Sequence, residues 1–183
     1  GNLIELRIFN FLDGLGIFFK VDPLGMVFGL VSSTLWIFAT VYSIGYMAHE
    51  HEQRNYFVFF VLSCSAAMGV AFAGSLFTFY IFYEYLAICT YPLVVHAGTP
   101  ESVKAGIKYI SYSLAGGALV FLSIFMIHDL VGTLEFVPGG ILASALADNA
   151  TRITVIFALL IAGFGTKAAL MPLHSWLPGA MVA

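Results

Sequence analysis

Five apolar runs, each about as long as a membrane-spanning helix, constrain this chain more than any other feature of its sequence. Crossing the hydrocarbon layer takes roughly 20 mainly apolar residues, and an α-helix satisfies its backbone polar groups within the segment. The runs predict spans at about residues 24–46, 56–73, 76–95, 102–127 and 153–177. With 61% hydrophobic and 9% charged residues, the chain has too few polar side chains to cover a water-soluble globule. We therefore expect an all-α, multi-pass transmembrane helix bundle.

The residues before the first run do not form a sixth apolar span. Polar residues and glycines interrupt the apolar ones there: Asn10, Asp13, Gly14, Gly16, Lys20 and Asp22. We expect residues 1–23 to be an N-terminal extramembrane segment, with a short strand at 16–21 on the membrane surface. Residues 24–183 would then form the transmembrane helical domain.

Pro172 interrupts the fifth apolar run. A proline inside a helix removes one hydrogen bond, and its ring clashes with the carbonyl four residues earlier, which belongs to Ala168. The sequence therefore predicts a broken or kinked helix at Pro172. Within a membrane such a break is tolerated only where the freed carbonyls meet protein or trapped water.

Glu84 lies near the middle of the third predicted span, about 12 Å from its start at ~1.5 Å of rise per residue. An ionisable group at that depth costs roughly 2.5 to 3.5 kcal/mol, so it normally faces protein or a water-filled cavity and marks an ion path. Helical spacing places Tyr80, Ala87 and Tyr91 on the same face, which we expect to point into the bundle. The alternative is a protonated glutamate that serves helix packing alone.

Lys167 lies in the fifth predicted span, five residues before Pro172. Its neighbours are small: Gly163, Gly165, Ala168 and Ala169. Small side chains let adjacent backbones approach closely, which would enclose the lysine. A lysine beside trapped water at a helix break has what a proton relay needs. The alternative is that the side chain extends to the far membrane interface.

Glu84 and Lys167 together suggest a mechanism. Two charges about 7 Å apart, at an effective dielectric constant near 20, interact by roughly 2.4 kcal/mol. Each group would then influence the protonation of the other. We predict that this pair translocates protons, with Lys167 loading and unloading a proton as Glu84 approaches or retreats.

Further polar residues are candidates for a proton path: Lys104, Lys108, Tyr112 and His174. The first three share one face of the fourth predicted span, which runs inward from the membrane surface as a hydrated path would. His174 lies beside the predicted break, and histidine exchanges protons near neutral pH. The alternative is that the lysines anchor the helix among lipid headgroups, which is the better explanation for Lys104.

Several other classes of function lack the residues they need. Seven Lys and Arg against ten Asp and Glu give a net charge of −3 and no basic surface for nucleic acid. Cys64 and Cys89 lie in apolar runs without the spacing of a metal site. Axial ligation of haem needs histidines within helices, whereas His49 and His51 fall in a predicted loop. We therefore predict no cofactor, no metal and no catalytic chemistry in the chain itself.

Two segments resemble a known family. The segment around Glu84 reads FYEYLAICTYPLVVH, and the segment around Lys167 reads GFGTKAALMPLHSWLPGAMVA. Both resemble the antiporter-like subunits of respiratory complex I and, more nearly, the D-type subunit of Mrp-type cation/proton antiporters. Weaker likenesses, KVDPLG and YSIGYM, flank the first span, so the resemblance covers essentially the whole chain. It implies that Glu84 and Lys167 are the glutamate and lysine that this family uses to translocate protons.

The resemblance also implies an architecture and partners. In the family the first predicted span would be the third helix, and a second, inverted repeat of five helices follows, so we expect this sequence to be a truncated or split part of an inverted-repeat antiporter fold. The implied function is proton translocation, with or without sodium antiport, in a respiratory or Mrp-type complex of the cell (inner) membrane, beside other membrane subunits. The alternative is a structural or quinone-binding membrane subunit of a redox complex.

Overall fold

The computed structural model describes residues 4–12 and 15–182 of this chain, so Asp13 and Gly14 of the N-terminal segment lie outside the described residues. A β-hairpin comes first, formed by strands β1 (Ile4–Leu12) and β2 (Leu15–Val21). In the described part, five helices are long and apolar enough to cross a membrane. They are α1 (Pro23–Met47), α2 (Gln53–Ala71), α3 (Leu76–Val94), α4 (Pro100–Val131) and α5 (Ala150–Lys167). The predicted multi-pass helical bundle is confirmed, and a β-hairpin precedes it.

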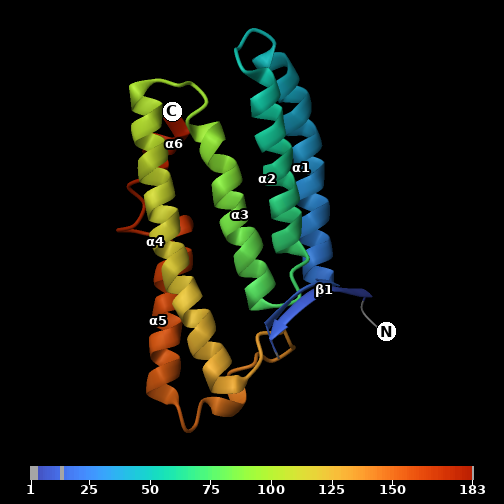
Figure 1. Ribbon diagram of the computed structural model, residues 1–183, viewed down its shortest axis with the longest axis vertical. Helices are drawn as coiled ribbons and strands as arrows, with labels where there is room; N and C mark the ends of the chain where they lie inside the picture. Colours follow the sequence, from blue (N-terminus) through green and yellow to red (C-terminus); the bar gives the residue numbers. More distant parts are fainter. Residues whose placement is uncertain (1–3, 13–14, 183) are drawn as a thin grey trace.

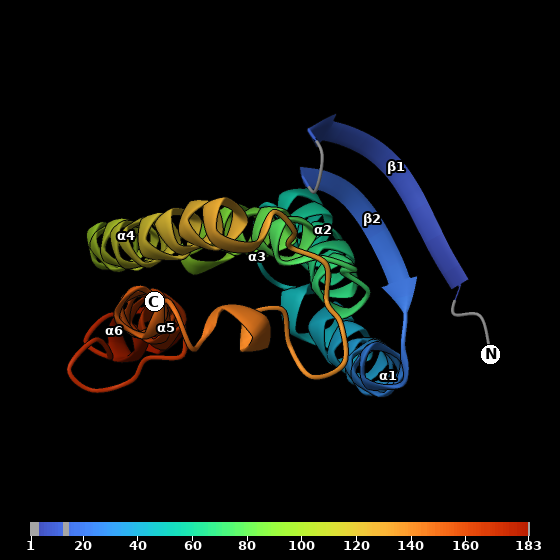
Figure 2. The same ribbon diagram turned by 90° about the horizontal axis from the view of Figure 1, so that it is seen from below.

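The five long helices run alternately up and down, and each packs against its neighbour along the chain (Figure 1). Seen from the end that carries the hairpin, they form an open arc with α1 at one end and α5 at the other (Figure 2). The chain between α4 and α5 crosses the open side of this arc. It includes the short 3₁₀ helix η1 (Ala143–Ala145). The long loop between α4 and α5 therefore lies at the same end of the bundle as the hairpin.

Local sequence signals set the ends of the helices. Asp22 accepts a hydrogen bond of 2.6 Å from the backbone N–H of Gly25, and Pro23 occupies the first turn of α1. Thr99 caps α4 in the same way, and Gly132 ends it in the left-handed conformation at φ 70°. Helix α4 is therefore longer at both ends than the predicted span 102–127.

The hairpin is joined to the helices through backbone hydrogen bonds. The N–H of Gly74 donates to the carbonyl of Phe18 at 3.0 Å, and the N–H of Phe136 donates to the carbonyl of Gly74 at 3.0 Å. The short connection between α2 and α3 thus lies between β2 and the loop after α4. Arg7 of β1 reinforces this arrangement, since its hydrogen bond to the Glu135 carboxylate raises the pKa of the guanidinium and keeps it charged.

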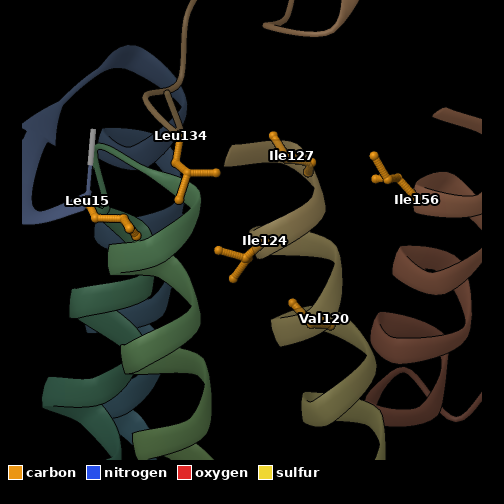
Figure 3. Packing of buried hydrophobic residues seen from close by; sticks show 6 residues of the cluster. All are labelled: Leu15, Val120, Ile124, Ile127, Leu134 and Ile156. Atoms are coloured by element: carbon orange, nitrogen blue, oxygen red, sulfur yellow. The ribbon is translucent and has the colours of Figure 1, made fainter. Parts of the chain in front are cut away.

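One buried apolar cluster holds this end of the bundle together (Figure 3). It comprises Leu15, Val120, Ile124, Ile127, Leu134 and Ile156. Leu134, in the loop after α4, is fully buried and points into the space between α3 and α4 (Figure 3). The members of the cluster come from β2, α4, the loop after α4 and α5, so their packing fixes these elements to one another.

The predicted helix break is confirmed, but the helix ends at Lys167 rather than at Pro172, which corrects the predicted span 153–177. Residues 168–176 are irregular, and the short helix α6 (Leu177–Val182) follows them. The cause is a Schellman motif, in which the N–H of Leu170 donates to the carbonyl of Gly165 and that of Ala169 to the carbonyl of Thr166. Ala169 adopts the left-handed conformation at φ 55° that this motif requires.

Candidate functional site

Glu84 and Lys167 lie side by side inside the bundle. Glu84 comes from the middle of α3, and Lys167 is the last residue of α5. The ammonium Nζ of Lys167 is 3.6 Å from the carboxylate Oε1 of Glu84, and each side chain is 15% exposed. The distance is about half the 7 Å assumed from the sequence. The two charged groups are therefore close enough to influence one another strongly.

The end of helix α5 suits a positive charge. The last carbonyls of a helix lack partners within the helix and carry partial negative charge, which favours a cation in the final turn. Lys167 lies in that turn, and the Schellman motif turns the chain sharply away directly after it. The lysine side chain reaches across to α3, where its Nζ donates a hydrogen bond of 2.5 Å to the backbone carbonyl of Tyr83.

Tyr83 is a site residue that the sequence did not indicate. Besides its carbonyl, it offers the face of its ring, whose centroid is 3.5 Å from Lys167 Nζ. Consecutive residues of a helix point about 100° apart, so helical spacing from Glu84 selects Tyr80 and Ala87 rather than Tyr83. The side chains of Tyr83 and Glu84 point in different directions from α3. The Lys167 ammonium lies between them and contacts both residues.

Glycines on α4 and α5 make room for the pair. A Cβ atom placed on Gly117 of α4 would lie 2.5 Å from Glu84 Oε1, so no larger residue fits there without moving the carboxylate. Gly116 of α4 lies against Gly163 of α5. A Cβ atom added to one of these glycines would lie less than 3.0 Å from the carbonyl oxygen of the other. The two helices therefore approach closely, as small residues permit in membranes.

The face of α3 that carries Glu84 points toward α4, as expected. Ala87 is buried, and the ring of Tyr80 stacks on Phe121 of α4 with centroids 5.3 Å apart. Tyr91 lies against Gly106 of α4. Glu84 is therefore enclosed by protein on this side.

Two of the four path candidates meet the broken segment. Lys108 Nζ donates a hydrogen bond of 2.6 Å to the backbone carbonyl of Ser175, and the hydroxyls of Tyr112 and Ser175 are 2.9 Å apart. Lys104 and His174 are exposed, and among the described residues neither side chain makes a hydrogen bond or an ion pair. The structure thus brings Lys108 and Tyr112 to the break and leaves Lys104 and His174 at the surface.

Trp176 anchors the broken segment against α4 and α5. Its indole Nε1 donates a hydrogen bond of 2.8 Å to the carbonyl of Thr166, and its ring lies 5.2 Å from that of Tyr109. The Tyr109 hydroxyl in turn lies 2.6 Å from the Thr90 hydroxyl on α3. Sequence reasoning missed these contacts, although Ser175 and Trp176 stand in the quoted PLHSW segment.

A metal site or a ligand cavity would be another kind of functional site in the described residues. No group of three or more His, Cys, Asp or Glu side chains there is arranged to hold a metal ion. A cavity of about 520 Å³ lies between the start of α1 and the end of α2, with a mainly apolar lining that includes Phe28, Val70 and Phe136. Asp22 also borders this cavity, but its carboxylate already caps α1.

The five long apolar helices define a multi-pass membrane protein, and comparison with known proteins gives its family. Residues 73–183 match the family model described as NADH:quinone oxidoreductase/Mrp antiporter, TM. Residues 14–57 match the model described as NADH-Ubiquinone oxidoreductase (complex I), chain 5 N-terminus. The first match covers more than half of the chain, which therefore belongs to the NADH:quinone oxidoreductase/Mrp antiporter transmembrane family.

The relatives include an antiporter subunit and a quinone oxidoreductase subunit. The chain is 28% identical over 168 residues to the D-type subunit of the Na⁺/H⁺ antiporter of Bacillus subtilis (strain 168), covering 92% of this chain and 34% of that protein. It is 30% identical over 168 residues to the chloroplastic NAD(P)H-quinone oxidoreductase subunit 5 of Mutisia acuminata, covering 89% of this chain and 23% of that protein. The chain thus spans about a third or less of the length of these relatives.

Two solved structures share the fold. One belongs to the Mrp complex from Dietzia sp. DQ12-45-1b, with a TM-score of 0.88 and 20% identity, covering 99% of this chain and 20% of that one. The other belongs to the membrane-bound sulfane sulfur reductase, an archaeal respiratory membrane complex, with a TM-score of 0.72 and 27% identity, covering 90% of this chain and 33% of that one. Both are parts of membrane complexes.

Proposed function

We propose that this chain is part of a proton-translocating membrane subunit in which Glu84 and Lys167 exchange and relay protons. The observation that carries the proposal is the 3.6 Å separation of Lys167 Nζ and Glu84 Oε1, with both side chains largely enclosed. Groups that bear charge inside a membrane are costly and normally mark an ion path. The pair also lies at the broken end of a helix, where the backbone leaves its regular helical hydrogen bonding.

The separation of the two groups suggests how the pair works. At 3.6 Å and an effective dielectric constant near 20, opposite charges attract by roughly 4 to 5 kcal/mol. This attraction favours the charged form of both groups while they are close. When Glu84 moves away or accepts a proton, the attraction is lost and Lys167 releases its proton more readily. A cycle of approach and retreat would therefore load and unload the lysine.

We further propose that protons reach the pair along α4 and the broken segment. Lys108 donates to the backbone carbonyl of Ser175 and Tyr112 is hydrogen-bonded to its hydroxyl, so two polar side chains of α4 reach the break. Lys104 and His174 would extend this path at the surface, where their side chains are exposed. Exchange with water is easy for exposed amines and imidazoles, so these positions suit the outer end of a path.

The relatives support a place within a larger complex. One is named as an Na⁺/H⁺ antiporter subunit and others as quinone oxidoreductase subunits, so the proposed cargo is protons, with or without sodium. We propose other membrane subunits as partners and the cell membrane as the location, because the solved relatives are parts of membrane complexes.

Proton flux in vesicles tests the proposal. The intact parent protein would be reconstituted with Glu84→Gln or Lys167→Ala, and flux measured with a pH-sensitive dye. Each change should reduce flux at least tenfold, because either one removes half of the pair. Lys20→Ala is the matched control, since Lys20 lies in the hairpin and pairs with Glu5 instead. Normal flux in both site variants would mean that the pair serves packing alone, as in a structural or quinone-binding subunit.

A further inference from the structure

The Lys167 ammonium has two kinds of partner, and the neutral one is nearer. Its Nζ is 2.5 Å from the carbonyl oxygen of Tyr83 and 3.5 Å from the centroid of the Tyr83 ring. The Glu84 carboxylate oxygen, at 3.6 Å, lies beyond ordinary hydrogen-bond distance. A cation over the face of an aromatic ring is attracted within about 6 Å, and the attraction strengthens when both groups are removed from water.

The structure holds the Tyr83 ring firmly in this place. The ring meets Phe164 of α5 edge to face, with centroids 5.4 Å apart, and stacks with Phe79 of α3 at 5.8 Å. Its hydroxyl is buried and has no hydrogen-bond partner among the described residues. A buried hydroxyl without a partner is unfavourable, so the hydroxyl does not explain the position of the ring. Packing against Phe79 and Phe164 holds the ring, and the face of the ring is turned toward Lys167.

We propose that Tyr83 is a positioning residue for Lys167, which holds the ammonium inside the bundle through its ring and its backbone carbonyl. This inference rests on the proposed function, because it gives the lysine a partner for the part of the cycle in which Glu84 is neutral or withdrawn. A charged amine without a partner in an apolar interior loses its proton or extends toward the interface. Tyr83 keeps the amine inside the bundle and moderates the loss of its proton, which still becomes easier once Glu84 withdraws.

Fluorination of the ring separates this electrostatic role from packing. Tyr83 would be replaced by phenylalanine and then by phenylalanines bearing one, two and three ring fluorines, in the intact parent protein. Fluorine withdraws charge from the ring face and changes the ring shape little, so only an electrostatic contact weakens along the series. Phe82 is the matched control position, because its ring lies on the same helix but meets Phe19 and Tyr85.

The readout is the acylation rate of Lys167, measured by mass spectrometry with a membrane-permeant reagent. Acylation requires the neutral amine, so weaker support of the ammonium speeds the reaction. Lys104, which is exposed, is the internal reference. We expect the ratio of Lys167 to Lys104 labelling to rise about tenfold along the series at Tyr83. We expect no change along the series at Phe82.

A flat ratio at Tyr83, or an equal rise at Phe82, would overturn the positioning role. This result does not depend on transport, because labelling reports the state of the amine directly. Failure of the proposed function would show itself differently, as normal proton flux in Glu84→Gln and Lys167→Ala. The two ideas can therefore fail separately.

Discussion

The indole Nε1 of Trp176 donates a hydrogen bond of 2.8 Å to the backbone carbonyl of Thr166, the residue directly before Lys167. The carbonyls in the last turn of a helix have no partner within the helix. Trp176, which is buried, supplies one of these partners from ten residues further along the chain. The broken segment thus folds back on the helix end that presents Lys167, and it stabilises that end.

Removing this hydrogen bond should loosen the helix end. Trp176→Phe keeps an aromatic ring beside Tyr109 but deletes the donor, so we expect the unfolding free energy to fall by roughly 1 kcal/mol. Backbone amides of residues 164–170 should exchange hydrogen faster, as measured by mass spectrometry. Trp36→Phe is the matched control, since the Trp36 Nε1 has no hydrogen-bond partner among the described residues. Unchanged exchange at 164–170 in Trp176→Phe would contradict this role.

A single methyl group at Gly117 should disable the candidate site. In Gly117→Ala the new Cβ would lie 2.5 Å from Glu84 Oε1, so the carboxylate must leave its present position beside Lys167. We expect proton flux in vesicles to fall about tenfold or more, because the lost attraction between the charges is several kcal/mol. Gly45→Ala is the control, as an added Cβ there meets nothing within 4 Å. Equal flux in the two variants would show that the position of the carboxylate does not matter.

The left-handed residue after the helix end offers a stabilising change. Ala169 has φ 55°, which is strained for alanine and easy for glycine. Ala169→Gly should therefore raise the unfolding free energy by roughly 0.5–1 kcal/mol. Ala168→Gly should lower it by a similar amount, because Ala168 has φ −74° and glycine only adds freedom to the unfolded chain. Thermal unfolding of the purified parent protein measures both, and the opposite order would refute the assignment of the motif.

One buried hydroxyl on α3 adds to the backbone hydrogen bonds that attach the hairpin. Thr78 is fully buried, and its Oγ1 accepts a hydrogen bond of 3.1 Å from the N–H of Phe18 and lies 3.2 Å from the carbonyl of Gly16. Thr78→Val preserves the shape but removes the acceptor of the Phe18 N–H and leaves the Gly16 carbonyl with only the Ser75 hydroxyl at 3.5 Å, so we expect a loss of about 1–3 kcal/mol in unfolding free energy. Thr78→Ser retains the hydroxyl and should lose less. Proteolysis within residues 4–21 that is no faster in Thr78→Val than in Thr78→Ser would argue against this attachment.

In the candidate site, spacing along one helix predicts some neighbours of Glu84 and misses others. The positions of Tyr80, Ala87 and Tyr91 beside Glu84 follow from the helical period, and the structure places all three against α4 or within the protein. Tyr83 and Ser175 were missed because their roles arise between elements. A lysine 84 residues away meets the carbonyl of Tyr83, and a lysine 67 residues away meets that of Ser175. Spacing along one helix does not contain such contacts.

The sequence by itself determined the number of candidate spans, the class of protein and the two ionisable residues that stand within apolar runs. It could do so because lipid demands about 20 apolar residues per helix and makes a charge within such a run conspicuous. Only the tertiary structure decided that the fifth helix ends at Lys167 rather than at Pro172, since Trp176 and the Schellman motif supply its last carbonyls with partners. It also decided that Lys167 meets Tyr83 as well as Glu84, because the approach of α5 to α3 depends on packing among all the helices.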